Sequence, residues 1–144
     1  MKKKILITLL LTAVVIQFFR IDPTNPESPA GQDFLGNMQP PQEIGKMLRS
    51  ACYDCHSNST VYPWYTKVQP LGWWIKGHVK NGRRQLNFSE WSLLDAEEQS
   101  HKLSESVEEI EERHMPLKSY TWLHPEAKLS NQDRERLAAW LGSL

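Results

Sequence analysis

The stretch Cys52-Tyr53-Asp54-Cys55-His56 decides the fold predicted for this chain. Its pattern is C-x-x-C-H, the attachment signature of a c-type haem. Thiols at positions i and i+3 lie on one face of a helical turn, so both can add to the two vinyl groups of one porphyrin. The next histidine is then held beneath the ring, where its imidazole can bind iron. The motif therefore predicts covalent haem c on Cys52 and Cys55, with His56 as the proximal iron ligand.

Other interpretations of the cysteine pair stay open at this point. C-x-x-C also occurs in zinc sites and in thiol redox sites. The 2 cysteines of the chain both lie in the motif, so a separate structural disulfide is excluded. A non-haem Cys/His zinc module is therefore an alternative to the haem interpretation.

Composition narrows the class of protein. The 144 residues are enough for one domain, and the net charge of +0 gives no basic surface for nucleic acid. The 6 tryptophans, 4 tyrosines and 4 phenylalanines are many for this length. A haem offers such rings a flat apolar surface to pack against. We therefore expect one aromatic-rich domain around one cofactor, without a nucleic-acid partner.

The N-terminus has the pattern of a secretion signal. Lysines at positions 2–4 precede an apolar run from Ile5 to Phe19. Small residues that would suit cleavage do not follow this run directly, so residues 1–21 favour an uncleaved signal anchor over a signal peptide. A helix from Ile5 to Ile21 would be about 25 Å long, slightly short of a ~30 Å hydrocarbon core. The lysines place their end in the cytoplasm. The domain is then predicted to face the periplasm, membrane-tethered, or soluble there if the signal is cleaved.

The remaining chain divides into a linker and an all-α domain. Residues 22–39 are the predicted linker, because prolines and polar side chains dominate their first part. The domain is expected to begin near Phe34 or Pro40, and residues 40–144 are the predicted c-type haem-binding domain. Its first helix carries an apolar stripe that runs directly into the motif, so the buried face ends at the two thiols. The stripe consists of Ile44, Met47, Leu48, Ala51, Cys52 and Cys55.

Three further helices are expected in this domain. The second helix starts near Leu71 and carries His78 on its apolar stripe, while three glycines lower its intrinsic stability. A third begins at an N-cap on Asp95 and must stop near Met115, because the following proline disfavours helix. A fourth begins at a capping box on Ser130. The glycines are Gly72, Gly77 and Gly82.

His56 needs a hydrogen-bond acceptor for its second ring nitrogen, and the iron needs a second ligand. The sequence suggests candidates for both. A metal-bound histidine usually donates its other ring N–H to a carbonyl or carboxylate group, and the carbonyl of Pro70 or Pro63 is the predicted acceptor for His56. Met115 is the predicted distal ligand, because its thioether lies on a proline-restrained loop where a helix ends. The rivals are His114 and His78, followed by His101, His124 and an open position.

The whole pattern resembles class I cytochrome c, with a first helix leading into C-x-x-C-H, a Met-bearing loop downstream and a C-terminal helix packed across the first. More closely, it is similar to short signal-anchored haem-binding domain proteins of Bacteroidetes type. The resemblance implies haem on Cys52 and Cys55, proximal ligation by His56 and distal ligation by Met115. The shared features are the Lys-rich apolar start, the single C-x-x-C-H, Pro70-Leu71-Gly72-Trp73-Trp74, Met115-Pro116, Tyr120 and His124-Pro125-Glu126-Ala127.

These features predict a cytochrome c-like electron carrier, not an enzyme, folded as a helical domain around one haem. It is tethered by its N-terminal membrane-anchor helix and exchanges electrons with redox partner proteins that the sequence does not identify. The alternative within haem proteins is a sensor or peroxidase-like protein with an open distal site. The electron carrier and the sensor or peroxidase-like protein share the motif. They differ in whether a side chain binds the iron on the side opposite His56.

Overall fold

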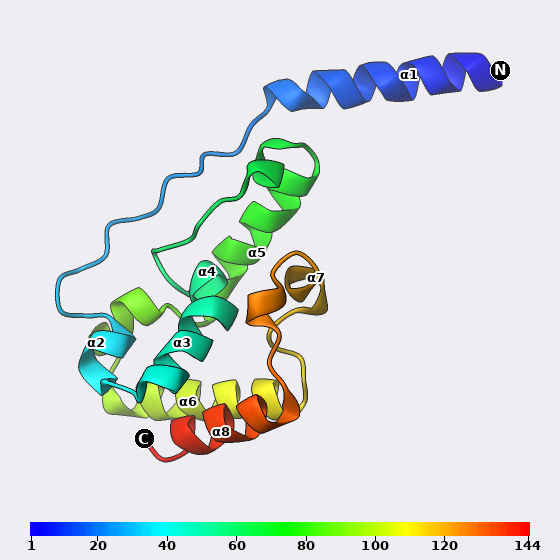
Figure 1. The fold of residues 1–144 in the computed structure, drawn as a ribbon. Coiled ribbons are helices and arrows are strands. Elements are labelled where there is room, and N and C mark those ends of the chain that lie inside the picture. The colour runs from blue at the N-terminus through cyan, green and yellow to red at the C-terminus, as the bar shows by residue number, and fades with distance from the viewer.

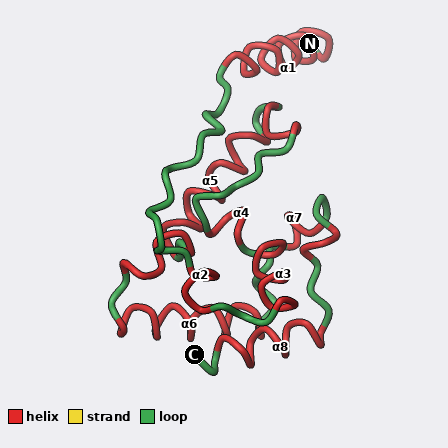
Figure 2. Tube along the Cα trace, turned by 60° about the vertical axis from the view of Figure 1, so that its left-hand side comes forward, coloured by secondary structure: helices red, strands yellow, loops and turns green.

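The computed structural model describes residues 1–144 and is all-α, as predicted, with no strand (Figures 1 and 2). Short 3-10 turns, labelled η, connect several of the helices. The α-helices are α1 (Lys2–Val15), α2 (Phe34–Met38), α3 (Gln42–Ala51), α4 (Tyr53–His56), α5 (Leu71–Gln85), α6 (Ala96–Glu111), α7 (Lys118–Thr121) and α8 (Asn131–Leu141). The 3-10 turns are η1 (Ile16–Phe18), η2 (Trp64–Lys67), η3 (Phe88–Leu93) and η4 (Pro125–Ala127).

The hydrophobic core lies at one end of the molecule, where α3, α6 and α8 meet α2 and η3 (Figure 1). The helix α8 packs along α6 and also contacts α3, the helix that leads into the motif. The fully buried Phe34 ring meets Trp91 edge-on, with ring centroids 4.8 Å apart. The apolar stripe of α3 is buried here through Ile44, Leu48 and Ala51. The core thus fixes α3, the helix that leads directly into the turn with the two cysteines.

The helix starts follow the local signals in the sequence. The Asp95 carboxylate accepts a hydrogen bond from Glu98 N, and the Ser130 hydroxyl accepts one from Asp133 N, so both predicted starts are confirmed as capping boxes. The helix α6 ends at Glu111, ahead of the predicted stop near Met115. Left-handed backbone at Arg113, with φ of 64°, turns the chain away first.

The packed part of the chain begins earlier than residue 40. Asp33 caps α2, because its carboxylate accepts hydrogen bonds from the backbone N–H groups of Leu35 and Gly36. Phe34 and Leu35 then enter the core. The linker predicted over residues 22–39 is therefore shorter than expected, and its last third belongs to the fold.

The N-terminal helix is also shorter than the sequence suggested. The helix α1 ends at Val15, so the expected helix as far as Ile21 is wrong in extent. The Phe19 carbonyl oxygen accepts a hydrogen bond from Trp73 Nε1 (2.7 Å), and the Gln17 side chain pairs with the backbone of Gln69 (2.9 Å), which draws the chain onto α5. None of the helices combines the length and the apolar character needed to cross a bilayer.

Candidate functional site

The motif forms a tight turn at the end of α3. Cys52 leaves helical geometry (φ −127°), and its carbonyl oxygen accepts hydrogen bonds from the N–H groups of both Cys55 (3.1 Å) and His56 (2.9 Å). Neither cysteine forms a disulfide, and both residues are intermediate in burial. The turn therefore presents the two sulfur atoms and the imidazole from one short segment.

The two residues between the cysteines hold this turn in place, a role that the sequence did not indicate. The Tyr53 ring stacks on Phe88 at a centroid distance of 5.1 Å, and its hydroxyl donates to the Asp33 carboxylate (3.1 Å). The Asp54 carboxylate accepts hydrogen bonds from Val61 N (3.0 Å) and from the Tyr120 hydroxyl (2.7 Å). Tyr53 thus joins the motif to the core, and Asp54 joins it to the loops on the other side.

The His56 imidazole is oriented for ligation through Nε2. Its Nδ1 lies 3.2 Å from the Leu86 carbonyl oxygen, which can only accept, so Nδ1 carries the proton. Burial holds the pKa of His56 below its usual value, which favours the neutral ring that a metal requires. The predicted acceptors, Pro70 and Pro63, were wrong, because the end of α5 passes beneath the ring and supplies the carbonyl group instead.

Burial also raises the pKa values of the two thiols. It raises the pKa of Cys52 to about 12 and that of Cys55 to about 11, with further contributions from Cys55 to the first and from the Asp54 carboxylate to the second. Both groups are therefore protonated in the free protein, and zinc would have to displace both protons. The chain also has no group of three or more His, Cys, Asp or Glu side chains that could hold a metal ion. The zinc alternative gains no support.

The helix α5 approaches the motif at Gly82. A Cβ atom at this position would lie 2.5 Å from the Cys55 carbonyl oxygen, so only glycine allows the observed packing of α5 on α4. Gly77, one and a half turns earlier, has no atom within 4 Å of such a Cβ. Gly82 is therefore needed for the close packing of α5 on the cysteine turn, whereas Gly77 is not needed for any close contact.

An open pocket with a cavity volume of about 70 Å³ lies beside Cys55, between α5 and the segment around α7. This volume is well below that of typical small-molecule and cofactor sites, but most of the lining is apolar or aromatic. The apolar stripe predicted for α5 faces this pocket. The lining residues are Asp54, Cys55, Thr60, Val61, Tyr62, Pro63, Tyr65, Leu71, Trp74, Ile75, His78, Val79, Leu117, Ser119, Tyr120, Leu123 and His124.

The candidate distal ligands are spread over different surfaces. His78 lines the cavity, and its Nδ1 lies 2.9 Å from the Trp74 carbonyl oxygen, so its Nε2 is the nitrogen left for a ligand. Met115 is not part of the lining, although Leu117, two residues later, is. His101 lies on the exposed face of α6 beside Glu105, and His114 is exposed just after the end of α6, beside Glu109 and Glu112. The structure therefore brings His78 to the cavity and leaves His114 and His101 outside it.

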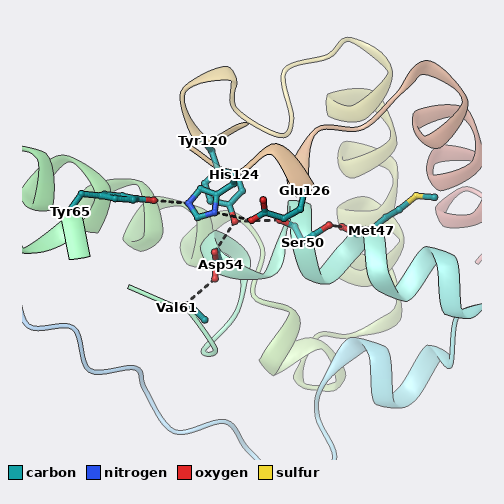
Figure 3. A network of polar contacts seen from close by, with 8 residues as sticks. All are labelled: Met47, Ser50, Asp54, Val61, Tyr65, Tyr120, His124 and Glu126. Carbon is teal, nitrogen blue, oxygen red and sulfur yellow. Dashed lines mark hydrogen bonds and ion pairs between the residues drawn. The ribbon is translucent and has the colours of Figure 1, made fainter. Parts of the chain in front are cut away.

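A polar network closes one wall of the cavity (Figure 3). The Tyr65 hydroxyl donates to His124 Nε2 (2.6 Å), whose Nδ1 lies 3.2 Å from the Glu126 carboxylate. The Tyr120 ring stacks on His124 with centroids 4.2 Å apart while its hydroxyl donates to Asp54. Burial is the main reason that the pKa of Tyr120 lies above its usual value, so this hydroxyl stays a donor. Because both of its ring nitrogens have partners, His124 is a residue of the pocket wall. Tyr65, its partner, was not predicted to have a role.

Replacing Tyr120 by phenylalanine is expected to lower the free energy of unfolding by about 1.5–3 kcal/mol, because Asp54 loses a charge-assisted hydrogen bond at a partly buried site. Chemical denaturation measures the loss. Tyr62→Phe is the matched control, since the Tyr62 hydroxyl only accepts a long hydrogen bond from Lys76 (3.3 Å) and should change stability by less than about 0.5 kcal/mol. Equal losses in both variants would contradict the assigned role of Tyr120.

The residues of the motif are those that would hold a haem. Cys52 and Cys55 are unpaired, His56 has one nitrogen fixed and the other available, and a mostly apolar, open pocket adjoins Cys55. These features define a small helical cofactor-binding protein. A family model described as haem-binding domain matches residues 11–143, and the chain belongs to this family. The predicted haem-binding class is thereby confirmed, while no curated protein and no solved structure matches at a significant level.

Proposed function

We propose that this haem-binding protein is a membrane-tethered c-type electron carrier. Cys52 and Cys55 attach the haem through thioether bonds, and His56 binds the iron through Nε2. The bound haem supplies one-electron redox chemistry. The chain contributes the attachment points, the fixed imidazole and the apolar walls that exclude water.

One observation carries this proposal: the apolar face of the first half of α5 lines the open pocket beside Cys55 and does not enter the hydrophobic core. Leu71, Trp74 and Ile75 line the cavity together with Cys55, outside the hydrophobic core. Exposed apolar area of this kind marks a ligand-binding surface. A porphyrin joined to Cys55 would cover this face, which gives the domain a second hydrophobic centre in place of a protein core.

Electron transfer further requires a saturated iron, because two strong axial ligands exclude oxygen and peroxide and limit the change in structure between oxidation states. Met115 remains the predicted distal ligand, on the chain segment that leads into the cavity wall at Leu117. His78 is its rival, supported by its place in the cavity lining and by its free Nε2. Either side chain is compatible with electron transfer.

Spectra of the wild type, Met115→Ala and His78→Ala test the proposal. The wild type is expected to be low-spin and to bind carbon monoxide poorly when reduced. The variant that lacks the distal ligand should become high-spin and gain carbon monoxide binding, while the other variant stays like the wild type. If the ligand is Met115, the weak near-infrared sulfur-to-iron band of the oxidised wild type should also vanish. A wild type that is already high-spin and binds carbon monoxide would favour the sensor or peroxidase-like alternative.

The membrane tether is proposed from the N-terminal segment. Its apolar side chains point outward on all sides, with Leu6 and Leu9 68% and 62% exposed, so the protein itself leaves them uncovered. The lysines at positions 2–4 favour the cytoplasmic side for that end. With this orientation the haem-binding domain is on the periplasmic side, the compartment where c-type haem is attached.

A further inference from the structure

The side of the domain next to the N-terminal segment carries exposed aromatic and apolar side chains. Trp64, Val68 and Trp73 are 75%, 46% and 41% exposed, and we call them the aromatic edge. The edge is formed by η2 and the start of α5, which pack together. The apolar N-terminal segment ends on this same surface, through Trp73 and the Phe19 carbonyl group. The edge is therefore continuous with the segment proposed to enter the membrane.

Charge is distributed unevenly along the molecule. Residues 55–89, which include η2 and α5, contain 5 Lys and Arg residues and no Asp or Glu. The helix α6, by contrast, contains 6 Glu and 1 Lys. Figure 1 shows the start of α5 beside α1 at one end of the molecule and α6 at the other. The neutral chain is thus polarised, with a basic segment that runs from η2 through α5 and includes the aromatic edge, and an acidic helix α6 at the opposite end.

We propose that the aromatic edge lies in the headgroup region of an anionic lipid bilayer, which fixes the orientation of the haem-binding domain on the membrane; this rests on the tether proposed above. Tryptophan favours the membrane–water interface because its ring is amphipathic. Each basic residue near an anionic surface strengthens attachment about fivefold. Exposed Lys67 and Lys80 flank the edge and meet this requirement, while the acidic α6 is repelled from the surface.

The test uses the full-length, haem-loaded protein in vesicles of phosphatidylcholine and phosphatidylglycerol. Hydroxyl-radical footprinting with mass spectrometry measures how fast each tryptophan is oxidised. Trp122 is the internal control, because it is 81% exposed but lies at the end of α7, away from the N-terminal segment. The expected result is that Trp64 and Trp73 are oxidised several-fold more slowly than Trp122.

Charge variants make the test specific. Lys67→Glu with Lys80→Glu should restore oxidation of Trp64, whereas the matched control, Lys46→Glu with Lys128→Glu, should keep it slow, since both control lysines are exposed elsewhere. Equal rates for the three tryptophans, with α1 protected, would overturn the orientation and leave the tether intact. Oxidation of α1 itself would overturn the tether as well. Protection of Trp64 only in native membranes would assign the edge to a protein and overturn the lipid proposal.

Discussion

Replacing both Cys52 and Cys55 by serine is expected to abolish covalent haem attachment completely. The chain has 2 cysteines, so the double variant retains no thiol that could form a thioether bond. Acidified organic solvent should then extract all haem from the variant and none from the wild type. The measurement is the haem absorbance that remains with the precipitated polypeptide.

The single variants are the matched controls for this experiment. Cys52→Ser and Cys55→Ser each keep one thiol on the same turn, so each should retain haem through one bond. Release of all haem from the wild type would contradict covalent attachment, even though the chain belongs to a haem-binding family. Retention of haem by the double variant would place the covalent bond on another residue.

Gly82→Ala is expected to destabilise the protein by about 2–3 kcal/mol, a large fraction of the stability of a small domain. The added Cβ would lie 2.5 Å from the Cys55 carbonyl oxygen, and backbone cannot move aside as a flexible side chain can. The helix α5 must therefore shift away from α4, and the Leu86 carbonyl group would move with it away from His56. Chemical denaturation of the variant and the wild type measures the loss.

Gly77→Ala in the same helix separates the clash from general effects of alanine. No atom lies within 4 Å of a Cβ at this position, so the variant should gain about 0.5–1 kcal/mol from the higher helix propensity of alanine. Opposite signs at the two positions would confirm that α5 packs on the cysteine turn through Gly82. A gain in both variants would show that the two helices are not in contact as described.

Local signals explain why the helices could be predicted. Asp95 and Ser130 each satisfy backbone donors within three residues of themselves, so their capping boxes are visible in the sequence. The same reasoning would have found α2, because Asp33 is a capping residue directly before Phe34, but the prolines upstream suggested a longer linker. The class of cofactor could also be predicted from a local signal, because that signal consists of five consecutive residues, Cys52 to His56.

Contacts between distant segments explain what could not be predicted. The Leu86 carbonyl group reaches His56 across 30 residues, and no spacing rule distinguishes it from the carbonyl groups of Pro63 or Pro70. The apolar stripe of α5 has the same pattern whether it faces protein or a cofactor, so the sequence could not show that it lines the pocket. Gly82 was noticeable in the sequence as a glycine inside a predicted helix. The reason for it becomes clear only when the position of α4 is known, because the Cys55 carbonyl group leaves no room for a Cβ atom.

The contacts of Asp54 also determine the order in which the domain folds. The cysteine turn needs only neighbouring residues, whereas the Tyr120 hydroxyl must return across 66 residues to reach the Asp54 carboxylate. The entropy cost of closing a loop grows with its length, so such long-range contacts form late. We therefore expect the cysteine turn to form before the wall around Tyr120 closes over it. The two thiols would then be accessible at an early stage of folding and covered at a later one.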